Sequence, residues 1–202
     1  MRIMDRSFFC CSAEELAKRL VGKIICHADG EGDNRFIIKV RITVTEAYLE
    51  DDISLDYNRS KETTSQAMEG GHLHYHYNTA PGRRRMDIVA GTTGKAESVL
   101  IAETDMYDGP QKTLWALGID DKKYDGMDLL SKDSSVWLED DGTTVISINS
   151  SQRKNIEDNR PLRFAAEGFL FNKQKKITIS KRLFIINSKP NSFGRIQRVG
   201  LF

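Results

Sequence analysis

The chain has 202 residues, of which 39% are hydrophobic and 29% charged, values that are ordinary for a globular protein. This length predicts one domain, and no apolar run approaches the roughly 20 residues that a membrane-spanning helix needs. Arg2, Asp5 and Arg6 interrupt any apolar signal region, so we expect an intracellular protein that is cytoplasmic, associated with the nucleoid in a bacterium or nuclear in a eukaryote.

The net charge of +1 conceals an uneven distribution of charge along the chain. Residues 173–202 contain 8 of the 30 Lys and Arg residues and no acidic residue, which leaves 22 basic against 29 acidic residues, or −7, for residues 1–172. A basic segment on an acidic body favours a polyanionic partner such as DNA, although a solvated tail has the same composition. We therefore expect one domain over residues 1–202, with residues 173–202 as a basic C-terminal extension.

The N-terminal half shows clear local signals. Ser12-Ala-Glu-Glu15 is typical of a capping box, and the apolar residues that follow at helical spacing predict a helix that ends at Gly22. A strand is expected from Lys23 to Cys26, and a Gly- and Asp-rich turn from His27 to Asn34. Phe36 to Tyr48 predicts a long strand, with Ile38, Val40, Ile42 and Val44 on one face.

The remaining elements are shorter. Residues 50–68 predict a long irregular segment of the kind that is often functional. A helix is expected over 112–117, ended by Gly118, and a strand pair over 136–138 and 145–148. Other strands are expected over 74–77, 86–90, 97–104, 177–179 and 183–186. Because strands dominate without regular βαβ alternation, the fold class is α+β, with a curved, largely antiparallel β-sheet flanked by helices.

The best single candidate for chemistry is Glu46. Alternation along its strand places Glu46 on the apolar, core-side face at the strand end, with Tyr48 facing the same way. Burial raises the pKa of a carboxyl group, which suits a general base that activates water. The alternative is that Glu46 pairs with a nearby Lys or Arg at the edge of the sheet.

Potential metal ligands are few. The three cysteines, Cys10, Cys11 and Cys26, lack the spacing of a metal site or of a disulfide framework. His72, His74 and His76 alternate and would share one strand face, where a His-x-His pair could bind zinc if a third ligand converged on it. No Cys or carboxylate has an evident pairing with these histidines, so we expect no metal and no cofactor.

Several short motifs occur together in this chain, among them Val44-Thr45-Glu46-Ala47-Tyr48-Leu49 and Gly109-Pro110-Gln111-Lys112 with Ala116-Leu117-Gly118-Ile119-Asp120. They resemble the V-E-T-E-A-Y-L, G-P-G-K and A-L-G-I-D motifs of the alkyladenine (3-methyladenine) DNA glycosylase family. Further collinear matches are Phe8-Phe9 with Leu20-Val21-Gly22-Lys23, Tyr75-His76-Tyr77, Met86-Asp87-Ile88-Val89, Val99-Leu100-Ile101 and Pro161-Leu162-Arg163-Phe164. The resemblance covers roughly residues 6 to 172, and its strength comes from the common order of many motifs.

This resemblance implies a metal-independent enzyme of base excision repair that flips an alkylated or deaminated purine out of double-stranded DNA and hydrolyses its N-glycosidic bond. Glu46 matches the acid that activates water, while Tyr48 and Tyr77 match rings that sandwich the base. An alkylated purine is cationic, so electron-rich rings favour it. Tyr57 falls where the family has a stacking His.

Some positions depart from the family pattern. Asp87 stands where the family has an Asn that crowds the guanine 2-amino group. Because a carboxylate accepts hydrogen bonds, we expect this protein to tolerate guanine lesions better. Comparing the excision of N-methylguanine by wild type and Asp87→Asn tests this expectation. Ala102 replaces an Arg beside the catalytic water. Residues 78–85 lack the intercalating aromatic residue, so Pro81 or an arginine must wedge or clamp the DNA instead.

The sequence thus predicts a monomeric, monofunctional purine DNA glycosylase. Its predicted residues are Glu46 for catalysis, Tyr48, Tyr57, Tyr77 and Asp87 for base binding, and Arg59, Arg83, Arg84 and Arg85 for DNA binding. The departures leave open a non-catalytic lesion-binding protein on the same scaffold, and the three histidines leave open a zinc hydrolase. Base release from lesion-containing oligonucleotides separates the first two, and metal analysis tests the third.

Overall fold

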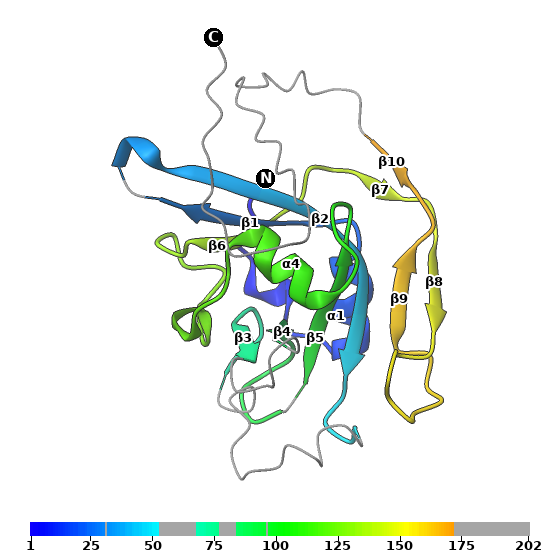
Figure 1. The fold of residues 1–202 in the computed structure, drawn as a ribbon. Coiled ribbons are helices and arrows are strands. Elements are labelled where there is room, and N and C mark those ends of the chain that lie inside the picture. Colours follow the sequence, from blue (N-terminus) through cyan, green and yellow to red (C-terminus); the bar gives the residue numbers. More distant parts are fainter. Residues whose placement is uncertain (31, 53–67, 77–83, 96, 172–202) are drawn as a thin grey trace, which may run out of the picture. The chain divides into compact units, whose positions relative to one another are not determined.

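The computed structural model describes residues 1–30, 32–52, 68–76, 84–95 and 97–171 (Figure 1). Residues Met1–Asn172 form one compact unit of the chain. The strands expected over 177–179 and 183–186 and the basic extension over 173–202 lie outside the described residues. No helix in the described part of the chain is long and apolar enough to span a membrane.

Helix α1 (Ala13–Leu20) begins and ends where its sequence signals predict. The side chain of Ser12 caps it by accepting a hydrogen bond from the backbone N–H of Glu15 at 3.2 Å. Gly22 follows the helix with φ of 88°, and an added Cβ would lie 2.6 Å from a methyl group of Val145. This turn therefore requires glycine, both for its conformation and for the close approach of the neighbouring segment.

Within the described residues, eight strands form one sheet, in the order β3-β4-β5-β2-β1-β6, with β9 added beside β2 and β8 beside β9. Every pairing within it is antiparallel. A separate two-stranded sheet joins β7 and β10. The strands are β1 (Ile24–Asp29), β2 (Phe36–Tyr48), β3 (Leu73–His76), β4 (Arg85–Val89), β5 (Ser98–Thr104), β6 (Val136–Glu139), β7 (Thr144–Val145), β8 (Ile148–Ser151), β9 (Arg163–Ala166) and β10 (Phe169–Leu170).

The curled sheet and the two α-helices of the described residues, α1 and α4, confirm the α+β fold class (Figure 1). Helix α4 (Pro110–Leu117) starts with proline and ends at Gly118, whose φ of 70° is left-handed. One core cluster joins α1, α4 and the sheet through fully buried side chains that include Leu16, Leu20, Ile101 and Leu117. Burying each such side chain contributes roughly 1.5–3 kcal/mol. Three short 3₁₀ turns complete the described elements, at Arg6–Phe8, Gly32–Asn34 and Lys122–Tyr124.

The long strand β2 has the predicted bounds but does not keep one face throughout. Its pairing with β5 shifts register between Ile42 and Val44 and again between Val44 and Thr45. Ile42 belongs to the main core, whereas Val44 and Tyr48 belong to a second apolar cluster. The expectation that Ile42, Val44 and Glu46 share the core-side face is therefore wrong, because the irregularity interrupts the two-residue alternation.

Two further expectations are corrected by the sheet topology. The segment at 136–138 does not pair with 145–148, because β6 instead pairs with β1, β7 with β10 and β8 with β9. The first turn is also shorter than expected, since β1 continues through Asp29 and pairs with the start of β2. Local turn signals predict neighbouring hairpins, but partners distant in sequence decided these pairings.

Candidate active site

One row of residues crosses five strands of the sheet. His74 of β3 lies opposite Asp87 of β4, Asp87 opposite Leu100 of β5, Leu100 opposite Glu46 of β2, and Glu46 opposite Arg163 of β9. Directly opposed residues of antiparallel strands project from the same face of the sheet. The row therefore places two carboxylates, an imidazole and a guanidinium on one face, although they are widely separated in sequence.

Glu46 is buried, with only 3% of its surface exposed, and its carboxylate is well partnered. Arg163 Nη1 donates to Oε1 at 2.6 Å, and the backbone N–H of Lys154 donates to the same oxygen at 3.4 Å. The Tyr48 hydroxyl donates to Oε2 at 3.3 Å. The predicted adjacency of Glu46 and Tyr48 is present, and so is the ion pair that was the alternative interpretation of Glu46.

Arg163 connects Glu46 to a second carboxylate. Its Nη2 lies 2.5 Å from Oε1 of Glu103, which also accepts from Lys154 Nζ at 3.1 Å. A planar guanidinium can bridge two carboxylates in a fixed geometry, which an ammonium group cannot do as well. Glu46 and Glu103 are thereby held on either side of one cation.

The ring of Tyr48 is buried beneath two cationic side chains. The guanidinium carbon of Arg153 lies 4.8 Å from the ring centroid and that of Arg85 lies 5.1 Å from it. Burial raises the pKa of the Tyr48 hydroxyl, and the nearby Arg85 counteracts this only in part. Tyr48 therefore remains a neutral hydrogen-bond donor toward Glu46.

The two guanidinium groups differ in how firmly they are held. The Arg153 side chain is fully buried, pairs with Asp52 and with Asp158 at 2.7 Å, and donates to the carbonyl of Ala47 at 2.9 Å. The Arg85 side chain is 28% exposed, and its Nε makes a loose ion pair with Asp87 at 3.8 Å. Arg153 is thus a fixed part of the site, whereas Arg85 has access to solvent.

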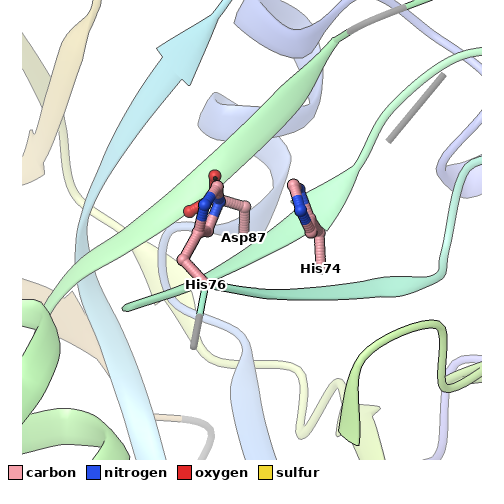
Figure 2. A group of neighbouring side chains, drawn as sticks. All are labelled: His74, His76 and Asp87. Atoms are coloured by element: carbon pink, nitrogen blue, oxygen red, sulfur yellow. Dashed lines mark hydrogen bonds and ion pairs between the residues drawn. The ribbon is translucent and has the colours of Figure 1, made fainter. Parts of the chain in front are cut away.

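At one end of this row, His74 and Asp87 form a cluster with His76 (Figure 2). His76 Nε2 lies 2.8 Å from Asp87 Oδ2, and the Ser98 hydroxyl donates to the same oxygen at 3.3 Å. Burial by itself raises the pKa of Asp87, but His76 and Arg85 outweigh it and hold that pKa well below its usual range. Burial and the neighbouring His76 lower the pKa of His74 to about 4.

This cluster revises the prediction for the three histidines. His72 precedes β3 and its ring contacts the carbonyl of Glu69 at 2.7 Å, so it does not join the other two histidines. A carboxylate does converge on His74 and His76, contrary to the absence of an evident partner in the sequence. Asp87, predicted to contact the base, has a side chain only 2% exposed.

The other predicted site residues are only partly covered by the structure. Tyr57, Arg59, Tyr77 and Arg83 lie outside the described residues, as do Pro81 and most of the 78–85 segment. Arg84 is exposed, and its Nη1 reaches the carbonyl of Asp120 at 3.4 Å. Ala102 is buried in the second apolar cluster with Val44, Tyr48 and Leu100. The assignments of these residues to base and DNA binding stay predictions.

The sequence interpretation missed three residues of this site: Arg153, Arg163 and Glu103. Arg163 lies in a motif that was noted without a role, and β9 was not predicted, so its position opposite Glu46 could not be seen. Glu103 is marked in the sequence only as a charge that follows an apolar run, and Arg153 lies among polar residues and carries no signal of burial. A buried carboxylate does, however, need a compensating partner, so the expected burial of Glu46 is a sequence signal that points to a nearby cation such as Arg163.

Comparisons with known proteins agree with the motifs of this site. The family described as methylpurine-DNA glycosylase matches residues 7–104. A protein of Chlorobaculum parvum named "Putative 3-methyladenine DNA glycosylase" is 33% identical over 162 residues, which are 69% of this chain and 74% of that protein. A protein of Anaeromyxobacter sp. with the same name is 28% identical over 185 residues, covering 83% of this chain and 91% of the relative.

Proposed function

The chain belongs to the methylpurine-DNA glycosylase family, and from that premise we propose that it excises alkylated purines from DNA, with Glu46 as the general base that activates water. The observation that carries the proposal is the buried carboxylate of Glu46, held between Arg163 and the hydroxyl of Tyr48. Catalytic carboxylates are commonly held in this way by partners that set their orientation.

The hydrogen bonds of Glu46 leave room for a water molecule. An ionised carboxylate offers about four acceptor positions, and Arg163, Lys154 and Tyr48 together fill three of them. In the proposed reaction a water bound at the fourth position gives a proton to Glu46, and its oxygen forms a bond to C1′. The glycosidic bond breaks toward the base, and a ring-methylated purine leaves as a neutral molecule because it was cationic in DNA.

Arg163 is proposed as the positioning residue for Glu46. The family pattern implies an Arg at position 102, where this chain has a buried alanine. Arg163 supplies a guanidinium from the opposite side of β2, because β9 pairs with that strand directly at Glu46. Its bridge to Glu103 restrains the orientation of its planar group, and therefore that of the Glu46 carboxylate.

Tyr48 can receive a flipped base only if a cation leaves its ring. Arg153 is fully buried and has several partners, so the partly exposed Arg85 is the group that we propose to move. An alkylated purine is itself cationic and would replace the guanidinium of Arg85 in its attraction to the ring. A neutral purine would not compensate for this loss equally well, which supports a preference for charged lesions.

The test is release of the base from duplex oligonucleotides that contain 7-methylguanine, hypoxanthine or ethenoadenine, scored as abasic sites. Wild type should release at least one of these bases, and Glu46→Gln should abolish release while still binding the DNA. Glu157→Gln, a matched change at an exposed glutamate, should behave as wild type. Lesion binding without release in both wild type and Glu46→Gln would overturn the catalytic proposal and favour a lesion-binding protein.

A further inference from the structure

The histidine–aspartate cluster on β3 and β4 has the composition of a metal site. His74, His76 and Asp87 each offer one ligand atom, and these three atoms all lie within 4.8 Å of one another (Figure 2). His74 and Asp87 are directly opposed in the strand register, and His76 is two residues along the same strand as His74. The three side chains therefore project from one face of the sheet.

Two buried polar atoms of this cluster lack a hydrogen-bond partner among the described residues. They are Nδ1 of His74 and Oδ1 of Asp87. A buried polar atom without a partner costs about 1–3 kcal/mol, so two in one cluster are unusual for a purely structural hydrogen-bond network. The rings of His74 and His76 also lie close together, with 4.1 Å between their centroids.

We propose that His74, His76 and Asp87 bind one divalent transition-metal ion, of which zinc is the best match. Two imidazoles and one carboxylate suit zinc and leave a fourth position open to water. Zinc bonds of about 2.0 Å in a tetrahedral site separate neighbouring ligand atoms by about 3.3 Å. His76 Nε2 and Asp87 Oδ2 lie 2.8 Å apart, so a slight opening of this pair and a closing of His74 toward it would complete the site.

The charges around the cluster allow a cation. Arg85 is the nearby positive group, but its Nε lies 3.8 Å from Asp87 Oδ1 and its side chain is 28% exposed, so it can turn toward solvent when a metal binds. Asp125 lies near enough to influence His74 and contributes a further negative charge. A divalent cation can therefore bind to the cluster without being repelled by a positive charge that is fixed in place.

The site goes beyond the proposed glycosylase activity. Along the row of opposed residues Asp87 is two strands from Glu46, a separation of roughly 10 Å between their backbones. The partners of Glu46 are Arg163, Lys154 and Tyr48, none of which belongs to the cluster, and the proposed hydrolysis needs no metal. The role of the ion is therefore to clamp β3 to β4 on the face that carries Glu46 and Tyr48.

The experiment is a titration of the full-length protein, first stripped with a chelator, with zinc and with cobalt as a spectroscopic probe. Wild type should bind one equivalent of either ion and unfold at a higher temperature when it is bound. The cobalt absorption should show nitrogen and oxygen ligands, without the charge-transfer band of a thiolate. His76→Ala and Asp87→Asn should each weaken binding by about 100-fold or more, since even indirect supporting groups cost 10–100-fold.

His72→Ala is the matched control, because His72 lies close in sequence but outside the cluster, and it should bind metal as wild type does. Circular dichroism of each metal-free variant checks that it is folded, and Asp87→Asn preserves the shape of the side chain. Binding that is absent in wild type, or equal in wild type, His76→Ala and Asp87→Asn, would overturn the proposal. Glu46→Gln should retain metal binding, so failure of the metal site and failure of the glycosylase proposal give different results.

Discussion

The ion pair between Arg163 and Glu46 makes a quantitative prediction. The two side chains are 10% and 5% exposed, and their closest atoms are 2.6 Å apart. Arg163→Met keeps much of the apolar volume but leaves Glu46 as a buried charge without its cation. Loss of one partner of a buried pair costs about 3–5 kcal/mol. For a chain of this size the midpoint of thermal unfolding should fall by about 10 °C.

A double variant separates the unpaired charge from lost packing. In Arg163→Met combined with Glu46→Gln neither charge of this pair remains, so the double variant should be more stable than Arg163→Met alone. Arg19→Met is the matched surface control, because Arg19 pairs with Glu15 on an exposed helix face with side chains 38% and 53% exposed. Removing that pair should cost only about 0.3–0.5 kcal/mol.

The assay is chemical and thermal unfolding of wild type, these variants and Arg163→Lys at neutral pH, together with base release by those that are folded. Arg163→Lys should restore part of the stability but little of the activity, because one ammonium cannot bridge Glu46 and Glu103 as the guanidinium does. The reasoning is refuted if Arg163→Met loses no more stability than Arg19→Met, or if adding Glu46→Gln brings no recovery.

Three other predictions concern separate parts of the chain. Arg85→Ala removes a cation from the ring of Tyr48, and with it a cation–π contact of about 0.5–1 kcal/mol that a bound base would otherwise have to displace. Free 7-methylguanine should therefore inhibit this variant about 3-fold more tightly than wild type, whereas Arg84→Ala should leave the inhibition unchanged. Deletion of residues 173–202 should flatten the dependence of log DNA affinity on log salt concentration, and an unchanged slope would mean that this segment makes no phosphate contacts. Burial raises the pKa of Cys26 to about 12, so a thiol reagent should label the exposed Cys10 but reach Cys26 only after denaturation. Because burial raises this pKa above its ordinary value of 9.0, the contribution of the Cys26 thiol to stability is present below pH 9.0 and is lost as the pH rises toward 12. Unfolding measured across that pH range checks this.

Elements with strong local signals were predicted well. The cap of α1 by Ser12, the full extent of β2 and the end of α4 at Gly118 all follow from residues close to the element itself. Propensity, alternation and glycine conformations act over a few residues, so a single sequence is enough to locate these elements. The family resemblance has the same basis, because each of its motifs is a short contiguous run.

Pairing between distant segments could not be predicted in this way. Strand β9 was not recognised, so neither Arg163 nor its position opposite Glu46 could be foreseen. The register irregularity in β2 also turned Glu46 to a face different from the one that strict alternation indicates. The hydrogen-bond partners that produce such an irregularity belong to other strands and leave no local mark in the sequence.

The sequence by itself determined which residues are able to do chemistry here: a carboxylate at the end of a long strand, a tyrosine two residues later, and alternating histidines. Only the tertiary structure decided their partners, by placing Arg163 against Glu46, two guanidinium groups over Tyr48, and Asp87 against His74 and His76. The physical reason is that side-chain chemistry belongs to each residue, whereas burial and charge pairing depend on neighbours that strand pairing brings from 11 to 117 positions away.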